Sequence, residues 1–451
     1  MADNSNEEYS DFESDDDFAS DEDSPRSEKK DEDVKINKGN NFIVSTEENK
    51  DEEYEEDQEE EDDNSFSRPE IRLAKLKKEI VDVDFNLSRI NRIKCIALCK
   101  IINGQNHWKV AEAHLDLANV YLRGKHYPLQ TLKHANLARE ILLDLQGKEN
   151  ATETTQLQYL LQNLYYVLGR ANCQLNKYKA SENCLQKAKT VADNARNATL
   201  KSLSMKVTIL SSLATTLSKL GQLGQAIECI EEGIEVVNKM SGDNSDLYIK
   251  LHKQMANLEL MNGKHANFSS AEESVNKALK LSIETNGQES SDTAEIYILG
   301  CRVESQKEII DFLKVETNLN EALKIYKNID SIDKIIATEQ MLCKMMMQQG
   351  KYLDATKVLG DCIQKCELFK GDMSIMSAEL YELMGSILFS QHKMPKALAY
   401  LEKAAEIYVG KKKHVKKQEK IMKIIDIIRK SSKDENVKTS EDKLKTRPRF
   451  H

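Results

Sequence analysis

The sequence predicts an all-α solenoid built from stacked helical hairpins. The chain has 451 residues, of which 40% are hydrophobic and only five are proline, a composition that favours helices around a long core. One pattern of turn, large apolar residue, small residue, large apolar residue and small residue occurs four times, in NKYKASENCLQKAKTV, GQLGQAIECIEEGIEVV, GKYLDATKVLGDCIQKC and HKMPKALAYLEKAAEIY. Such a repeat indicates units that bury their apolar faces against one another.

The two ends of the chain differ from the middle in charge. Residues 1–63 contain 28 acidic and 6 basic side chains, a net charge of -22. Their low apolar content cannot offset the entropy lost on folding, so we expect an acidic disordered tail over residues 1–66. Residues 411–451 contain 15 basic and 6 acidic side chains, a net of +9. We expect the last part, residues 431–451, to be a basic disordered tail.

Small residues in the second helix of each hairpin predict where helices cross. Large side chains do not fit where two helices cross closely. In the second helix of a hairpin, a first small residue allows close contact with the first helix of the same hairpin. A second small residue, seven positions later, allows close contact with the next hairpin. The early positions are Ser181, Ala226, Ala355 and Ala397. The late positions, followed along the chain, are Ala138, Ala188, Gly233, Ala278, Ala322, Cys362 and Ala404. They predict seven or eight hairpins over residues 70–410.

The first segment of this array allows two interpretations, and the last one allows a single interpretation. The segment 70–102 has apolar residues in a heptad that suits a coiled-coil dimer, but the helix-poor stretch DVDFN within it favours one more hairpin, with Cys95 as its late small residue. At the other end, QEKIMKIIDIIRK predicts an amphipathic helix over residues 413–430. This helix would cap the last hairpin, which a stacked array requires.

The stretch GQNHWKVAEAHLDLANVYL contains the single tryptophan and two histidines. His107 and His114 are two helical turns apart, so they could hold a metal, but no third ligand has a defined place. We therefore expect packing or capping histidines, and Trp108 packed between repeats. The sequence lacks GxxxxGK[ST], HExxH and GxSxG motifs and has no GxGxxG after a strand. We expect no enzyme, cofactor or metal.

The hairpin pattern resembles the tetratricopeptide repeat (TPR) family, and its spacing of 40 to 50 residues resembles the longer hairpins of kinesin light chains. KCIALCKIINGQNHWKVAEAHLDLANVYL, followed by LQTLKHANLAREIL, resembles more narrowly the tetratricopeptide repeat protein 23 and 23-like family, over about residues 93–145. The resemblance implies a right-handed superhelix of hairpins without catalytic residues. It also implies a scaffold at the cilium base or centrosome, with a role in Hedgehog signalling.

A solenoid of hairpins has an inner wall made by the first helix of each hairpin, and this wall can hold an extended peptide or a partner helix. We expect protein or peptide partners there, including ciliary or microtubule-associated proteins. Alignment of the hairpins assigns these residues to the wall: Asn163, Tyr166, Arg170, Thr208, Thr215, Lys253, Asn257, Gln340, Lys344 and Phe389.

The sequence thus predicts a non-enzymatic protein–protein interaction scaffold. A ciliary scaffold, a kinesin-light-chain-like cargo or microtubule adaptor, and a histone- or nucleic-acid-linked protein remain open. The array itself carries only about +3, from -10 + 22 - 9, so we expect no nucleic acid on it. Without a signal peptide or an apolar run of 18 residues, a cytoplasmic protein with no transmembrane segment is expected. Ser10, Ser14 and Ser20 each precede an acidic residue by three positions, which is typical of acidophilic kinase sites.

Overall fold

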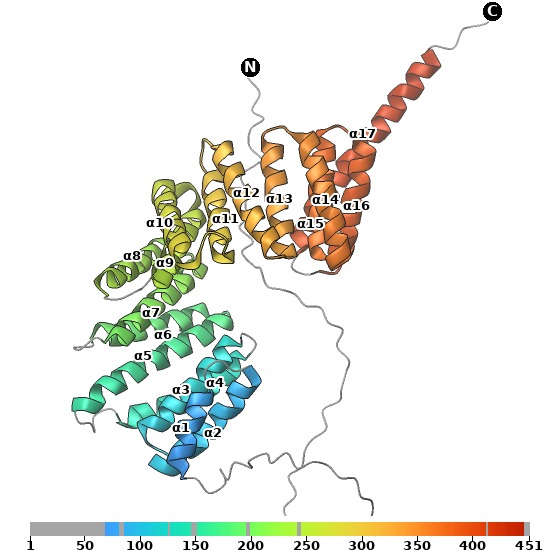
Figure 1. Cartoon of the computed structure of the whole chain (residues 1–451). Helices are drawn as coiled ribbons and strands as arrows, with labels where there is room; N and C mark the ends of the chain where they lie inside the picture. The colour runs from blue at the N-terminus through green and yellow to red at the C-terminus, as the bar shows by residue number, and fades with distance from the viewer. Residues whose placement is uncertain are drawn as a thin grey trace, which may run out of the picture.

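Helical hairpins follow one another along the described part of the chain. The computed structural model describes residues 68–80, 85–124, 127–145, 151–194, 199–240, 245–411 and 414–445. Figure 1 shows them as a curved row of stacked helices, and no β-strand occurs among them. The helices are α1 (Pro69–Glu79), α2 (Phe85–Asn103), α3 (Trp108–Arg123), α4 (Pro128–Leu145), α5 (Ala151–Gln174), α6 (Tyr178–Asp193), α7 (Leu200–Lys219), α8 (Leu223–Lys239), α9 (Ser245–Met261), the short 3-10 helix η1 (Gly263–His265), α10 (Phe268–Asn286), α11 (Ser291–Ser305), α12 (Phe312–Asn328), α13 (Ile332–Gln348), α14 (Tyr352–Lys370), α15 (Ile375–Ser390), α16 (Met394–Tyr408) and α17 (Val415–Lys445).

The helices pair as eight hairpins, from α1 with α2 to α15 with α16, and α17 follows them. The second helix of each hairpin contacts its partner and also the first helix of the next hairpin. The buried apolar side chains consequently form adjoining clusters along the array. The predicted all-α solenoid is confirmed. No helix in the part that the structure describes is long and apolar enough to cross a membrane.

The first hairpin settles how the segment before residue 104 is built. Helices α1 and α2 are separate and contact each other. Leu73 of α1 packs against a buried cluster that includes Ile96 and Cys99 of α2. Cys95, the late small residue expected for an extra hairpin, is buried. The hairpin interpretation therefore describes this segment, because the heptad is divided between two packed helices.

Close helix crossings occur where the small residues predict them. Ser181, Ala226, Ala355 and Ala397 are all fully buried. Glycines on the facing helices are packed as tightly: a Cβ atom added to Gly169 would lie 2.6 Å from Cγ of Leu185, and one added to Gly385 would lie 2.6 Å from Cγ of Leu401. In these hairpins a leucine of the second helix therefore lies directly on a glycine of the first.

Tight turns connect the two helices of four hairpins. Each has one residue with positive φ, which reverses the chain after the first helix. The following N–H then donates back into that helix, as from Lys177 to the oxygen of Asn172 at 2.9 Å. The positive-φ residues are Asn176, Gly221, Gly350 and His392.

Longer turns in two other hairpins depend on a buried glutamate near the end of the first helix. Glu259 accepts the N–H of Asn267 at 2.9 Å, and Glu304 accepts the N–H of Asp311 at 3.3 Å. Each glutamate therefore fixes the residue that begins the second helix, because Asn267 and Asp311 cap α10 and α12 with their side chains. Between α11 and α12 the carboxylate takes the place of a positive-φ residue, whereas the turn between α9 and α10 also contains Gly263 with a φ of 55°.

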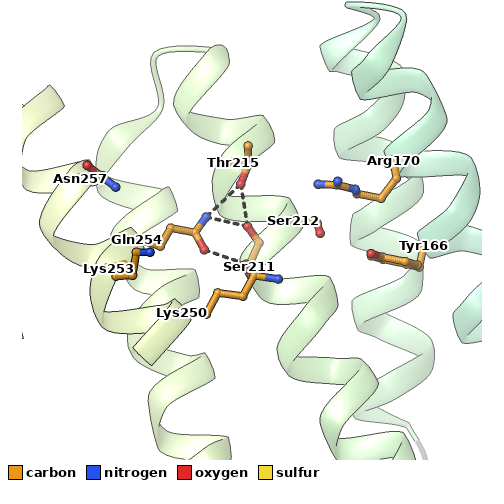
Figure 2. Close-up of a pocket in the computed structure, with 9 residues that line it drawn as sticks. All are labelled: Tyr166, Arg170, Ser211, Ser212, Thr215, Lys250, Lys253, Gln254 and Asn257. Carbon is orange, nitrogen blue, oxygen red and sulfur yellow. Dashed lines mark hydrogen bonds between the residues drawn. The ribbon is translucent and has the colours of Figure 1, made fainter. Parts of the chain in front are cut away.

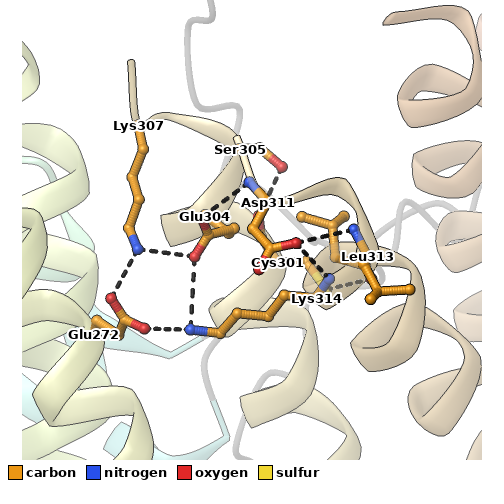
Figure 3. A network of polar contacts seen from close by, with 9 residues as sticks. Glu272, Cys301, Glu304, Ser305, Lys307, Asp311, Leu313 and Lys314 are labelled. Atoms are coloured by element: carbon orange, nitrogen blue, oxygen red, sulfur yellow. Dashed lines mark hydrogen bonds and ion pairs between the residues drawn. The ribbon is translucent and has the colours of Figure 1, made fainter. Parts of the chain in front are cut away.

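The second of these turns is held by a network of charges (Figure 3). Lys307 donates to Glu304 at 2.8 Å and to Glu272 of α10 at 2.7 Å. Lys314 of α12 also pairs with both glutamates. The network joins three helices at one place, and it neutralises a Glu304 side chain that is only 4% exposed.

The last helix caps the array as expected but is longer than predicted. Ile421, Ile425 and Ile428 of α17 are buried against the final hairpin. The predicted helical end at residue 430 was wrong, because α17 continues to Lys445.

Composition explains the additional length of α17. Residues 431–445 contain neither proline nor glycine, so no residue stops a helix that is already nucleated. This part of the chain was predicted to belong to the disordered basic tail. The predicted acidic tail, with Ser10, Ser14 and Ser20, lies outside the described residues.

Replacing Gly385 by alanine should destabilise the last hairpin. The new Cβ would lie 2.6 Å from Cγ of Leu401 and 3.4 Å from the backbone oxygen of Ala397. The helices must then separate, which should lower the free energy of unfolding by about 1–3 kcal/mol. Gly360, inside α14, has no neighbouring atom within 4 Å of its Cβ position, so Gly360→Ala should raise that energy by about 0.5–1 kcal/mol. Chemical denaturation measures both; equal stability of the two variants would contradict the close crossing.

Removing the Glu304 carboxylate should destabilise the turn between α11 and α12. Glu304→Ala leaves the N–H of Asp311 without its acceptor and removes one of the two carboxylates that pair with Lys307 and Lys314, which should cost about 1–3 kcal/mol of unfolding free energy. Glu304→Gln retains an acceptor for the N–H and should cost less. Glu308→Ala is a control, because Glu308 is an exposed residue of the same turn. Thermal and denaturant unfolding should rank the variants in this order, and a neutral Glu304→Ala would show that the network is dispensable.

Candidate functional site

A pocket of about 370 Å³ opens on the inner wall, the face made by the first helix of each hairpin. It lies across α5, α7 and α9, which belong to three consecutive hairpins. Figure 2 shows the side chains that line it. They are Tyr166, Arg170, Ser211, Ser212, Thr215, Lys250, Lys253, Gln254 and Asn257.

The small residues at the helix crossings explain why these side chains meet. Gly169, Ala214 and Ala256 are all buried on their helices, 45 and 42 residues apart along the chain. The residue after each small residue therefore occupies an equivalent place on the wall. These residues are Arg170, Thr215 and Asn257, and all three line the pocket.

Five of the ten wall residues predicted from the sequence line this pocket, and four further lining residues were missed. The same alignment places Lys250 at the position of Asn163 and Thr208, and Ser211 at the position of Tyr166 and Lys253. Both could therefore have been found by extending the alignment. Ser212 and Gln254 lie one residue after aligned positions, and no sequence signal identified them.

One half of the pocket is fixed by hydrogen bonds between α7 and α9. Gln254 donates to the oxygen of Ser211 at 2.8 Å and to the hydroxyl of Thr215 at 2.9 Å. Its own side-chain oxygen accepts the Ser211 hydroxyl at 2.7 Å. These bonds, drawn in Figure 2, hold the two helices in register. The amide and the two hydroxyls therefore form a rigid floor.

Lys253 and Asn257 contact the following hairpins. Lys253 pairs with Glu295 of α11 at 2.9 Å, and Glu295 also pairs with Lys334 of α13 at 2.9 Å. Asn257 accepts a hydrogen bond from Arg302 at 3.3 Å. The two lysines hold the pKa of Glu295 below its usual range, although burial acts in the opposite direction. The charge of Lys253 is therefore already balanced within the wall.

The other half of the pocket holds two cations without a carboxylate partner in the part of the chain that the structure describes. These are Arg170 of α5 and Lys250 of α9. The Nε atom of Arg170 is buried and has no hydrogen-bond partner there. Burial lowers the pKa of Lys250, and the positive charge of Arg170 lowers it further. The pocket therefore offers an unbalanced positive charge.

Asn163 and Thr208 were predicted to face a partner, and neither lines the pocket. Asn163 is only 7% exposed and accepts a hydrogen bond from Asn119 of α3 at 3.4 Å. The Thr208 hydroxyl donates to the backbone oxygen of Ser204 at 3.0 Å. Asn163 therefore links two helices instead of facing a partner, because its amide is buried between them.

The remaining predicted residues lie further along the wall. Gln340 and Lys344 belong to α13 and Phe389 to α15. Helix α11 separates them from the pocket along the array. Lys344 is exposed and Phe389 is 36% exposed. The structure therefore does not bring them together with Tyr166 and Arg170.

The histidines around Trp108 have structural contacts. His107 caps α3 by accepting the N–H of Lys109 at 3.2 Å. His114 is buried with its Nδ1 3.2 Å from Nδ1 of His134, and burial, followed by the nearby His134, lowers the pKa of His114 to about 4. Among the residues that the structure describes, no three His, Cys, Asp or Glu side chains lie close enough to hold a metal ion.

Comparison with known proteins agrees with the repeat pattern. The family profile described as tetratricopeptide repeat matches residues 207–236, which lie in α7 and α8. Tetratricopeptide repeat protein 23 of Homo sapiens is 26% identical over 327 residues, covering 70% of this chain and 71% of that protein. Tetratricopeptide repeat protein 23-like of Mus musculus is 26% identical over 354 residues, covering 76% of each.

A solved structure supports the fold. The crystal structure of the apo form of RapI is similar with a TM-score of 0.51 and 12% sequence identity, covering 81% of this chain and 98% of that chain. At this identity the likeness concerns the arrangement of the helices alone. Together the comparisons point to a repeat scaffold that binds proteins.

Proposed function

We propose that the chain, which matches the tetratricopeptide repeat profile over residues 207–236 and resembles tetratricopeptide repeat protein 23, binds a protein partner along its inner wall, centred on the pocket between α5, α7 and α9. The partner contributes an extended segment or a helix that lies across the first helices of consecutive hairpins. The protein acts by holding partners together, and the proposal assigns it no catalytic step.

The observation that carries this proposal is the open pocket on the wall. Its floor is fixed by Gln254, so a partner meets preorganised groups, which reduces the entropy lost on binding. Tyr166 and Arg170 stand on the side that the floor bonds do not engage. Tyrosine and arginine are also the residues that most often dominate binding energy at interfaces.

Replacing Tyr166 and Arg170 together by alanine should weaken partner binding without unfolding the chain. Residues of this kind commonly contribute more than 1 kcal/mol each, so recovery of partners should fall by about ten-fold or more. Quantitative affinity purification from cells, with mass spectrometry of the recovered proteins, measures the change. Because Tyr166 also packs against two buried apolar clusters, the thermal unfolding midpoint should fall, and recovery is therefore compared at a temperature well below the midpoint of the variant.

A control double variant tests whether the loss of basic side chains from any exposed surface is enough to weaken partner binding. Arg139→Ala with Lys280→Ala removes two exposed basic residues from α4 and α10, the second helices of their hairpins. This variant should recover partners as the unchanged protein does. Equal recovery by the pocket variant and the control would place the binding surface elsewhere.

We further propose that the scaffold acts at the cilium base or centrosome, in Hedgehog signalling. The support is the resemblance of residues 93–145 to the tetratricopeptide repeat protein 23 family, together with the similarity over 70% of the chain. A tagged full-length protein in ciliated cells should concentrate at the base of the cilium.

A kinesin-light-chain-like cargo or microtubule adaptor is the alternative, supported by the spacing of 40 to 50 residues between equivalent positions. An adaptor of this kind should move with vesicles along microtubules. Its distribution should disperse when microtubules are depolymerised, whereas a protein held at the cilium base should remain there. Live imaging before and after depolymerisation separates the two.

A further inference from the structure

The chemistry of the pocket is unusual for this chain. The array as a whole carries only about +3, yet the residues that line the pocket include three cations and no carboxylate. Lys253 is balanced by Glu295. The positive charges of Arg170 and Lys250 are not balanced by any carboxylate that the structure describes. Two cations therefore remain uncompensated in one concavity.

The groups around these cations are suited to bind an oxyanion. The guanidinium of Arg170 points into the pocket and offers a flat pair of terminal N–H donors. Ser212 and Tyr166 place hydroxyl donors on the same side of the pocket. A carboxylate accepts hydrogen bonds at both of its oxygens and matches the paired donors of arginine in plane and spacing.

We propose that this pocket binds an aspartate or glutamate side chain of the partner, so that the protein selects acidic peptide segments. The inference rests on the proposed function, since it identifies the chemistry that the inner wall recognises. Arg170 holds the carboxylate through the terminal N–H groups of its guanidinium. Lys250 adds the second charge, and the floor formed by Ser211, Thr215 and Gln254 keeps α7 and α9 at the spacing that admits it.

The charges of the pocket favour an anionic ligand over a neutral one. The two neighbouring cations repel each other, and burial already penalises the charged form of Lys250, so its pKa is lowered. A bound carboxylate would offset the repulsion between the two cations and raise the pKa of Lys250, because a nearby negative charge favours the charged form of the lysine. A glutamine in the same place would do neither, because it carries no charge.

The experiment uses the full chain and an array of randomised peptides. The unchanged protein should select sequences with aspartate or glutamate fixed at one position. For the strongest selected peptide, replacing that acidic residue by the corresponding amide should weaken binding by about ten-fold, as measured by fluorescence anisotropy at low salt. The difference should shrink as salt is raised.

A variant of the pocket then tests whether Arg170 and Lys250 bind the acidic residue of the peptide. In Arg170→Gln with Lys250→Gln the same change of peptide should alter affinity by less than about two-fold, because the amide and the acid meet no positive charge. Arg139→Gln with Lys280→Gln, which removes equal charge from exposed positions on α4 and α10, should retain the ten-fold discrimination.

The outcomes separate this inference from the proposed function. Selected peptides without an acidic position, or an acid-to-amide loss that is equal in the unchanged protein and the pocket variant, would overturn the carboxylate site while leaving the peptide-binding wall in place. Failure to select any peptide would overturn both. A preference for phosphoserine that glutamate cannot replace would also overturn the assignment of a carboxylate.

The same set of peptides tests whether the ligand is a segment of this chain. Residues 1–63 carry a net charge of -22, so peptides that tile this segment belong on the array. If the peptides from residues 1–63 bind more weakly than the selected peptides, the ligand is a separate partner. If tiled peptides bind more tightly than every other sequence, the site serves the protein's own acidic segment, and the assignment to a partner is wrong.

Discussion

The close approach of helices at small residues is the constraint on which the rest of the structure depends. Gly169, Ala214 and Ala256 are buried at equivalent places on the first helices of successive hairpins, and Gly169 lies directly against Leu185 of its own hairpin. Because each first helix then presents the same turn to the wall, residues more than 80 positions apart, such as Arg170 and Asn257, line one pocket. A larger residue at a crossing would change both the hairpin and the register of the wall.

Some polar side chains of the wall bond to one another and maintain the fold, whereas others remain available to bind a partner. The bonds from Gln254 and the pairs of Glu295 connect α7, α9, α11 and α13. They leave Arg170 and Lys250 facing the concavity without balancing charge in the described chain. The arrangement couples stability to recognition, since the bonds that stabilise the array also fix the shape of the binding surface.

The sequence was sufficient for the fold and for much of the pocket, because small residues recur at fixed spacing and report helix crossings directly. It was insufficient where a side chain's environment decides its role. Asn163 has the same alignment position as Lys250, yet Asn163 is buried against Asn119 while Lys250 lines the pocket. The end of α17 was missed for a different reason: a polar, charged composition permits either a helix or a disordered tail.

Photocrosslinking tests most directly whether partners bind on this wall. A photoreactive phenylalanine derivative placed at Tyr166 in the full chain lies beside the pocket, and one placed at Lys280 lies on an exposed face of α10. After irradiation in cells, the protein labelled at position 166 should form discrete adducts with partner proteins, and the protein labelled at position 280 should not. Identical adducts from both positions, or adducts from position 280 alone, would contradict partner binding on the inner wall.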